Sequence, residues 1–335
     1  MPLSDHLNIT APLEGRKPIG ERANPLEGCP LQALSQPRPF GSKTRNCLVL
    51  LLLFATVAWF WPPLVLLFSL TQQQEHYSHI VLIPFVSLYT LYLKRTAILS
   101  SGEWSPWIGL LVMGIGGWVY WSYGTDALSG DQLVLSIMSF VVTLWGAFLF
   151  SFGMSVCRIA AFGLLILIFI VPFPAVILDA IIGFLQRNSA EATAILFSVL
   201  GIPVFREGFV FSLSSFTIHV AEECSGIRSF LSLLIASLVV GHLFLMSFWA
   251  KLGLVSIVIP LAIIKNAFRI VGLALLANYV DPSFITDSVL HRSGGIPLSV
   301  LALAVIFCFV WLLRKVEKRF GYGSLDGLRA RPHIS

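Results

Sequence analysis

The sequence predicts an all-α, polytopic membrane protein, and two observations lead to this fold class. The 335-residue chain is 56% hydrophobic and only 12% charged, whereas a soluble domain carries about a quarter charged residues. Several apolar runs approach the roughly 20 residues that a helix needs to cross a bilayer. Lipid offers the backbone no hydrogen-bond partners, so each such run is expected to be helical. The net charge of +5 is therefore weak evidence for nucleic-acid binding. The positions of the Lys and Arg residues are more informative, because they orient the helices in the membrane.

The apolar runs define about eight predicted transmembrane helices. Pro62-Pro63 should kink the first of them, and the second and fifth are shorter than a bilayer requires. The predicted spans are residues 47–70, 80–93, 107–123, 133–152, 159–171, 230–246, 252–276 and 296–313.

The positive residues orient these spans. Residues 1–45 are rich in proline, glycine and charge and are predicted to be a disordered cytoplasmic tail. Residues 46–315 form the transmembrane domain, and residues 316–335 a basic cytoplasmic tail. Alternating the loops puts both tails, Lys94, Arg95, Arg158 and Lys251 on one side and leaves Arg187, Arg206, Arg228 and Arg292 on the other. This bias predicts that both termini are cytoplasmic.

The longest loop between spans, residues 172–229, is expected on the extracytoplasmic side. Apolar residues recur at helical spacing within residues 173–200, which predicts a helix on the outer membrane surface or packed against the bundle. Gly201-Ile202-Pro203 should end it. Two short β-prone runs, residues 209–213 and 216–220, flank Ser214-Ser215 and predict a hairpin.

Cys224 is the first candidate for chemistry. It is the only one of the five cysteines that the predicted topology puts on the outer face, so it has no disulfide partner there. Ser225 and Gly226 are suited to helix capping, and the partial positive charge at a helix N-terminus favours a thiolate. The alternative is a small cysteine that only packs. No cysteine pair has zinc-ligand spacing, so neither a metal nor a cofactor is expected.

Two further candidates lie on the following spans and loop. Lys265 and Arg269 are four residues apart in an apolar helix, so they share a face that should line the bundle interior or a wet cavity. The alternative for each of them is a structural role, as a cation in the bundle with a carboxylate or carbonyl partner. His291 precedes the last span and titrates near neutrality, and Asp287, four residues earlier, is suited to orient it. The alternative is that His291 is an interfacial histidine with no catalytic role.

Cys224, Arg269 and His291 belong to a pattern that resembles the exosortase/archaeosortase family. Its parts are Ala-Glu-Glu-Cys-Ser-Gly-Ile-Arg-Ser at residues 221–229, Asn266-Ala-Phe-Arg269, and His291 before a glycine. Tyr77-Ser78-His79 and Val204-Phe205-Arg206-Glu207-Gly208 are also similar to that family. The resemblance covers roughly residues 70–314. The tryptophan expected after His291 in many members is replaced by Gly294-Gly295.

The resemblance implies a membrane cysteine protease or transpeptidase on the outer face of the bacterial inner membrane. It would cut the C-terminal sorting tail (PEP-CTERM-like) of exported proteins and pass them to an envelope acceptor, a polysaccharide or lipid. Cys224 would be the nucleophile, His291 the general acid and base, and Arg269 the cation for the oxyanion or substrate. Supporting positions without an assigned role are Glu222, Arg228, Asn266 and Asp287. His79 and His219 are expected to be structural or to contact the substrate.

Two other functions remain open on the sequence. Lys265, Arg269 and Pro260 are compatible with an anion path in a transporter or assembly component for envelope polysaccharide. A purely structural scaffold would leave Cys224 and His291 without a role.

Overall fold

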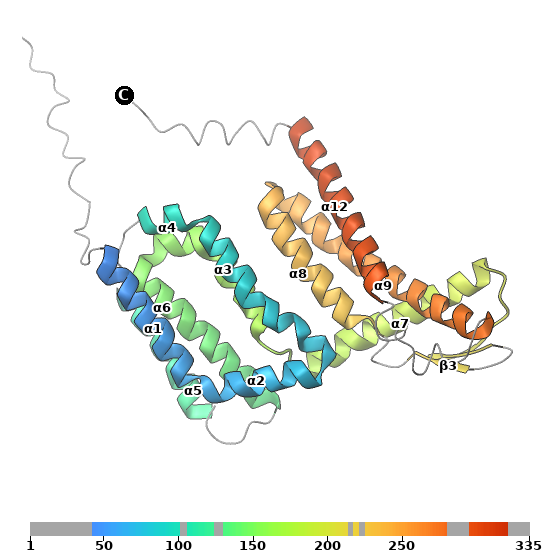
Figure 1. The fold of residues 1–335 in the computed structure, drawn as a ribbon, viewed down its shortest axis with the longest axis horizontal. Helices are drawn as coiled ribbons and strands as arrows, with labels where there is room; N and C mark the ends of the chain where they lie inside the picture. The colour runs from blue at the N-terminus through green and yellow to red at the C-terminus, as the bar shows by residue number, and fades with distance from the viewer. Residues whose placement is uncertain are drawn as a thin grey trace, which may run out of the picture. The chain divides into compact units, whose positions relative to one another are not determined.

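The computed structural model describes residues 42–100, 106–123, 130–213, 217–220, 225–279 and 295–320. Within these ranges the chain is mainly helical, with one small sheet (Figure 1). In chain order the elements are α1 (Ser42–Trp59), α2 (Trp61–Gln73), the 3₁₀ helix η1 (Glu75–Leu82), α3 (Ile83–Leu93), α4 (Arg95–Ser100), α5 (Pro106–Tyr123), α6 (Gly130–Leu165), the 3₁₀ helix η2 (Ile166–Ile170), α7 (Ala175–Val199), β1 (Phe205–Glu207), β2 (Val210–Ser212), β3 (Thr217–His219), α8 (Ile227–Phe244), α9 (Phe248–Tyr279) and α12 (Gly295–Arg319).

The described residues contain four helices that are long and apolar enough to cross a membrane, or five if the bent pair α1–α2 is one span. The predicted kink at Pro62-Pro63 is confirmed, because the axes of α1 and α2 differ by 71° across the break at Phe60. This count by length and composition takes α6 and η2 together as one helix, and it does not confirm the eight predicted spans. The predicted second span is the largest departure, since it is divided between η1 and the short helix α3.

The helix α6 is two antiparallel arms joined at Gly153. Gly153 has φ 80° and ψ 174°, outside the helical region. The indole N–H of Trp145 donates to the carbonyl of Leu164 at 2.9 Å, although 19 residues of straight helix would separate them by about 28 Å. Ile137 and Ile170 also belong to one buried cluster. The chain therefore reverses here, and the two arms correspond to the predicted fourth and fifth spans.

Gly153→Ala should destabilise the protein by about 1–3 kcal/mol, because its φ and ψ lie in a region that is essentially restricted to glycine. Thermal unfolding in detergent measures the effect. Gly114→Ala is the matched control, since an added Cβ at Gly114 in α5 meets nothing within 4 Å. An equal response of the two variants would contradict a conformational requirement at Gly153.

Glycines also set the distance between α5 and α6. A Cβ on Gly109 would lie 2.3 Å from the backbone nitrogen of Phe150, and one on Gly116 would lie 2.4 Å from Oγ1 of Thr143. Small residues at helix contacts permit this close approach in membranes. The pair α5–α6 is consequently a tightly packed unit.

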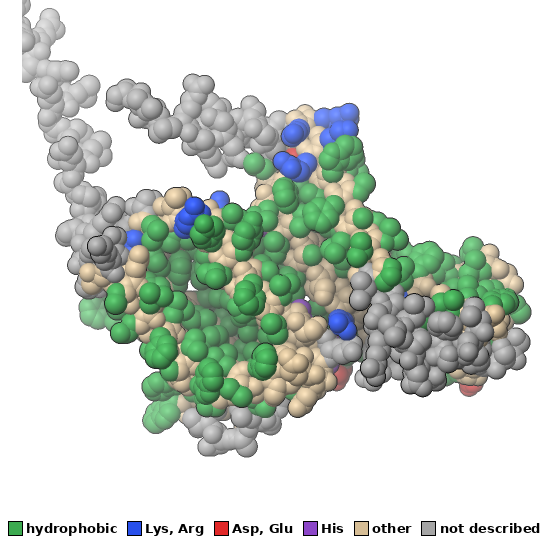
Figure 2. All heavy atoms as spheres, viewed as in Figure 1, with side chains coloured by type: hydrophobic (Ala, Val, Ile, Leu, Met, Phe, Trp, Pro, Cys, Tyr) green, Lys and Arg blue, Asp and Glu red, His purple; other side chains and the backbone are tan. Residues whose placement is uncertain are grey.

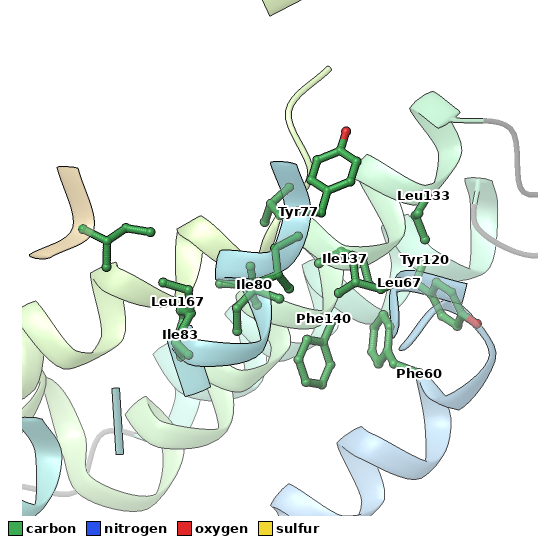
Figure 3. Packing of buried hydrophobic residues seen from close by; sticks show 14 residues of the cluster. Phe60, Leu67, Tyr77, Ile80, Ile83, Tyr120, Leu133, Ile137, Phe140 and Leu167 are labelled. Atoms are coloured by element: carbon green, nitrogen blue, oxygen red, sulfur yellow. The ribbon is translucent and has the colours of Figure 1, made fainter. Parts of the chain in front are cut away.

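The largest buried cluster joins this unit to the bend between α1 and α2 and to η1 (Figure 3). The ring of Phe60, at the break, lies 4.3 Å from that of Tyr120 and 5.6 Å from that of Phe140, centroid to centroid. Tyr77 and Ile83 carry the cluster along η1 into α3, and Ile235 extends it to α8. Through these contacts η1 is packed against the helix that follows Cys224.

The helices α8, α9 and α12 form a second bundle around Leu254, Val258 and Ile306. At one end, the carboxylate of Glu317 on α12 accepts hydrogen bonds from the backbone N–H groups of Met246 (3.1 Å) and Ser247 (2.7 Å). Glu317 thereby holds the two residues that lead into α9. Most of the Lys and Arg side chains visible in Figure 2 gather over the C-terminal end of α12 and over the α3–α4 region.

The predicted helix over residues 173–200 and the predicted hairpin are both present, as α7 and as β2–β3. The sheet has a further strand, β1, so that the described strands form an antiparallel sheet in the order β1-β2-β3. Gly208, with φ 60°, lies in the two-residue turn between β1 and β2, as primed hairpin turns require. A cluster that includes Phe197, Phe211 and Ile270 packs the sheet against α7 and α9.

A bidentate ion pair joins β1 to α7. Nη1 and Nη2 of Arg206 donate to the two carboxylate oxygens of Glu191 at 2.9 and 2.8 Å. These hydrogen bonds, together with the charge of Arg206, lower the pKa of Glu191 below its usual value. The carboxylate is well exposed, so the pair aligns β1 more than it stabilises the fold.

Glu191→Gln should lower the unfolding midpoint slightly at neutral pH and have no effect in acid. The pKa of Glu191 is lower in the folded than in the unfolded state, so its contribution is present above the unfolded pKa and is lost as pH falls through the folded pKa. Thermal unfolding of both proteins at several pH values below 7 measures this. A difference that persists at the lowest pH would show that the side chain acts by packing and not by charge.

Candidate functional site

The candidate site is built around the first turn of α8. The helix begins at Ile227, three residues earlier than the predicted span, and Gly226 is its N-cap with φ 82° and ψ 10°. Ser225 is buried, and its Oγ accepts a weak hydrogen bond, at 3.4 Å, from the backbone N–H of Ile227. The predicted capping role of Ser225-Gly226 is therefore met by backbone conformation and not by a strong side-chain cap.

Gly226 lies directly against Asn266 of α9. A Cβ on Gly226 would be 3.0 Å from Cγ of Asn266 and 3.2 Å from its Oδ1. Asn266 is itself almost fully buried. The Cys-Ser-Gly sequence and the Asn-x-x-Arg sequence, 40 residues apart in the chain, thus meet in van der Waals contact.

Lys265, the neighbour of Asn266, joins three helices. Its Nζ donates to Oγ of Ser229 on α8 and, at 2.8 Å, to Oγ of Ser299 on α12. The side chain is only 6% exposed. The expectation of a carboxylate or carbonyl partner needs correction here, because two hydroxyl groups receive these bonds.

Arg269 and Arg228 bring two more positive charges to this region. Arg269 lies one turn after Lys265 on α9 and is half-buried, whereas Arg228 on the first turn of α8 is exposed. The charges of both are close enough to act on Lys265. The result is a positive local field at the start of α8, of the kind that stabilises a thiolate or an oxyanion.

The sheet holds the segment that leads into this turn. Val220, just after β3, is buried, and its N–H donates to the carbonyl of Phe209 at 2.9 Å. Its own carbonyl accepts from Nε2 of Gln186 on α7 at 2.6 Å. The backbone is therefore fixed on both sides four residues before Cys224.

His79 and His219, which are not among the predicted catalytic residues, differ in environment. His79 on η1 is buried, and its Nδ1 lies 2.9 Å from the carbonyl of His76. Burial lowers the pKa of His79, although that hydrogen bond acts in the opposite direction. The neutral imidazole is favoured, in keeping with a structural role. His219 is exposed at the end of β3.

Of the predicted site residues, the structure describes Arg228, Asn266 and Arg269. Asn266 packs against Gly226 of α8, and the charges of Arg228 and Arg269 act on Lys265. Glu222, Cys224, Asp287 and His291 lie outside the described residues. In sequence, Cys224 comes one residue before Ser225, and His291 four residues before α12. Among the residues that the structure describes, no group of three or more His, Cys, Asp or Glu side chains is arranged to hold a metal ion.

Sequence reasoning missed the contribution of Ser229 and Ser299. A buried lysine needs hydrogen-bond acceptors, which predicts that partners exist. Ser229 was already within the pattern at residues 221–229, but a serine eight residues after His291 had nothing to distinguish it from other serines in apolar helices.

A comparison with known protein families matches residues 70–308 to the family described as Transmembrane exosortase (Exosortase_EpsH). The matched region runs from the end of α2 into α12 and includes the whole α8–α9 contact. No curated protein and no solved structure matches the chain significantly. Since the match spans more than two thirds of the chain and its apolar helices fit a multi-pass membrane protein, this chain belongs to the transmembrane exosortase family.

Proposed function

We propose that the protein is a membrane-embedded cysteine protease or transpeptidase with Cys224 as nucleophile, His291 as general acid and base, and Arg269 as the cation for the oxyanion or substrate. The observation that carries the proposal is the contact between Gly226 and Asn266. It joins the residue two positions after Cys224 to the helix turn that bears Arg269. Membership of the exosortase family supports a transpeptidase-type role for that arrangement.

In the proposed reaction, the Cys224 thiolate attacks the carbonyl carbon of the scissile peptide. The carbonyl oxygen gains negative charge, which Arg269 stabilises. His291 gives a proton to the departing amine, and the acyl group remains on the sulfur as a thioester. An acceptor amine or hydroxyl, or water, then loses its proton to His291 and takes the acyl group, which restores the Cys224 thiolate and the protonated His291.

The substrates would be exported proteins that carry a C-terminal sorting tail of the PEP-CTERM-like kind. The acceptor would be an envelope polysaccharide or lipid. We place the site on the outer face of the inner membrane with both termini in the cytoplasm. The gathering of Lys and Arg side chains over the C-terminal end of α12 and over the α3–α4 region supports this orientation (Figure 2), because cytoplasmic ends are enriched in positive charge.

The test is detection of the covalent intermediate. Membranes containing the protein are incubated with a tail-bearing exported protein, and the adduct is sought by gel shift and mass spectrometry. The expected result is a thioester on Cys224 that hydroxylamine cleaves and that prior treatment with a membrane-impermeant thiol reagent prevents. Substrate turnover with no adduct, and no loss of turnover after confirmed alkylation of Cys224, would overturn the proposal.

The transporter alternative gains no specific support from the described contacts. Lys265, which suggested an anion path, instead donates to Ser229 and Ser299 between packed helices. That arrangement favours a cross-link over a permeation path.

A further inference from the structure

Lys265 is the residue whose presence the proposed reaction does not explain. A lysine near the middle of a transmembrane helix costs roughly 3 kcal/mol on insertion scales, and Lys265 in α9 is only 6% exposed. It also lies near the like charges of Arg228 and Arg269. Replacing buried charged groups with apolar ones is often neutral or stabilising, so stability alone is a poor reason to keep an ammonium group here.

The hydrogen bonds of Lys265 suggest what it does. Ser229 lies five residues after Cys224, on the first turn of α8, and Ser299 lies eight residues after His291, near the start of α12. One ammonium group thus contacts both helices that follow the predicted catalytic residues. An ammonium has three donors in a compact group, which lets it serve two acceptors from different helices at once.

Asn266 adds a second, independent point of contact on the same turn of α9. Its side chain packs against Gly226, so α9 touches α8 on either side of the first helical turn, once at Gly226 and once at Ser229. These two contacts fix the position and the rotation of the first turn of α8. The bond to Ser299 then sets the start of α12 relative to that turn.

We propose that Lys265 is a positioning residue: its ammonium group ties the helix that follows Cys224 to the helix that follows His291 and so sets the separation of the two reacting groups. This inference rests on the proposed function. It assigns Lys265 no contact with substrate and no proton transfer. Its effect is geometric, and a displacement of about 1 Å between reacting groups can lower a rate by about 10²-fold.

The test compares Lys265→Met, Ser229→Ala, Ser299→Ala and the double serine variant in purified membranes with a tail-bearing substrate. Lys265→Met and the double variant should each lower kcat at least about tenfold while KM changes less than about threefold, because tail binding does not use this bridge. Adding Lys265→Met to the double variant should lower kcat by less than a further factor of about three, since the groups act through the same bonds.

Lys251→Met is the matched control, with the same substitution in the first turn of the same helix, and should leave kcat unchanged. Unfolding midpoints are measured for every variant, and rates are compared well below them. If Lys265→Met does not fold, the serine variants decide, because each removes one acceptor and leaves the lysine in place.

Wild-type kcat in Lys265→Met or in the double serine variant, or losses that multiply when the changes are combined, would overturn the inference. A fall in kcat that only follows a fall in folded protein would also overturn it. The proposed function fails separately, through full processing by Cys224→Ala. An inactive Cys224→Ala together with a fully active Lys265→Met would leave the function standing and remove only the positioning role.

Discussion

Cys224→Ala should abolish processing of a tail-bearing substrate, with a loss of at least about 10³-fold in kcat, because no other group in the proposed reaction can form the acyl intermediate. KM for the tail should change little if binding depends on other surfaces. The measurement is the ratio of mature to unprocessed exported protein over time, in membranes with matched amounts of each variant.

Cys308→Ala provides the control for loss of a thiol. Cys308 lies on α12 and is exposed on the helix surface without a disulfide, so its removal should leave processing unchanged. Cys224→Ser tests the chemistry further: a hydroxyl is a weaker nucleophile than a thiolate near neutral pH, and processing should stay low although the side chain keeps its size. Processing at the wild-type rate by either Cys224 variant would exclude a nucleophilic cysteine there.

Composition and hydropathy were sufficient to predict the helical membrane fold, and breaker residues located several of its ends. Pro62-Pro63 marks the bend between α1 and α2, and Gly201-Ile202-Pro203 follows the end of α7. These features are local, so a single sequence contains them. The hairpin β2–β3 was predictable for the same reason, from two β-prone runs around a pair of serines.

The features that sequence reasoning missed depend on contacts between distant segments. Strand β1 has only three residues, Phe205–Glu207, and its pairing with β2 and the ion pair to Glu191 define it. The break between the predicted fourth and fifth spans was expected, but its position at Gly153 was not, because hydropathy does not distinguish this glycine from an ordinary helical one. The division of residues 75–93 into a 3₁₀ helix and a short α-helix likewise follows from packing against α6 and α8.

The candidate site shows the same division between local and long-range information. The resemblance to the exosortase family predicted Arg269 and Asn266 as members of one site, and the structure packs Asn266 against the N-cap residue of α8. The reason that Gly226 must be glycine became visible only with the fold, since it depends on a left-handed φ and on a side chain 40 residues away.

Gly226→Ala should therefore lower kcat/KM by about 10²-fold. An alanine in the left-handed region costs about 1–2 kcal/mol, and its Cβ would also lie 3.0 Å from Cγ of Asn266. Asn266 is buried and so has little room to yield. Both effects displace the turn that follows Cys224. The fall in kcat/KM should therefore be larger than any loss of folded protein accounts for.

Two comparisons separate the causes. Gly253→Ala, at a glycine of α9 where an added Cβ meets nothing within 4 Å, should change neither the unfolding midpoint nor processing appreciably. In the background of Asn266→Ala the steric overlap is removed but the left-handed φ remains. The destabilisation by Gly226→Ala, measured by unfolding, should therefore be smaller there by about 0.5–3 kcal/mol, the range of coupling between touching residues. An unchanged destabilisation would mean that backbone strain alone acts at Gly226, and that its contact with Asn266 does not hold the two sequence motifs together.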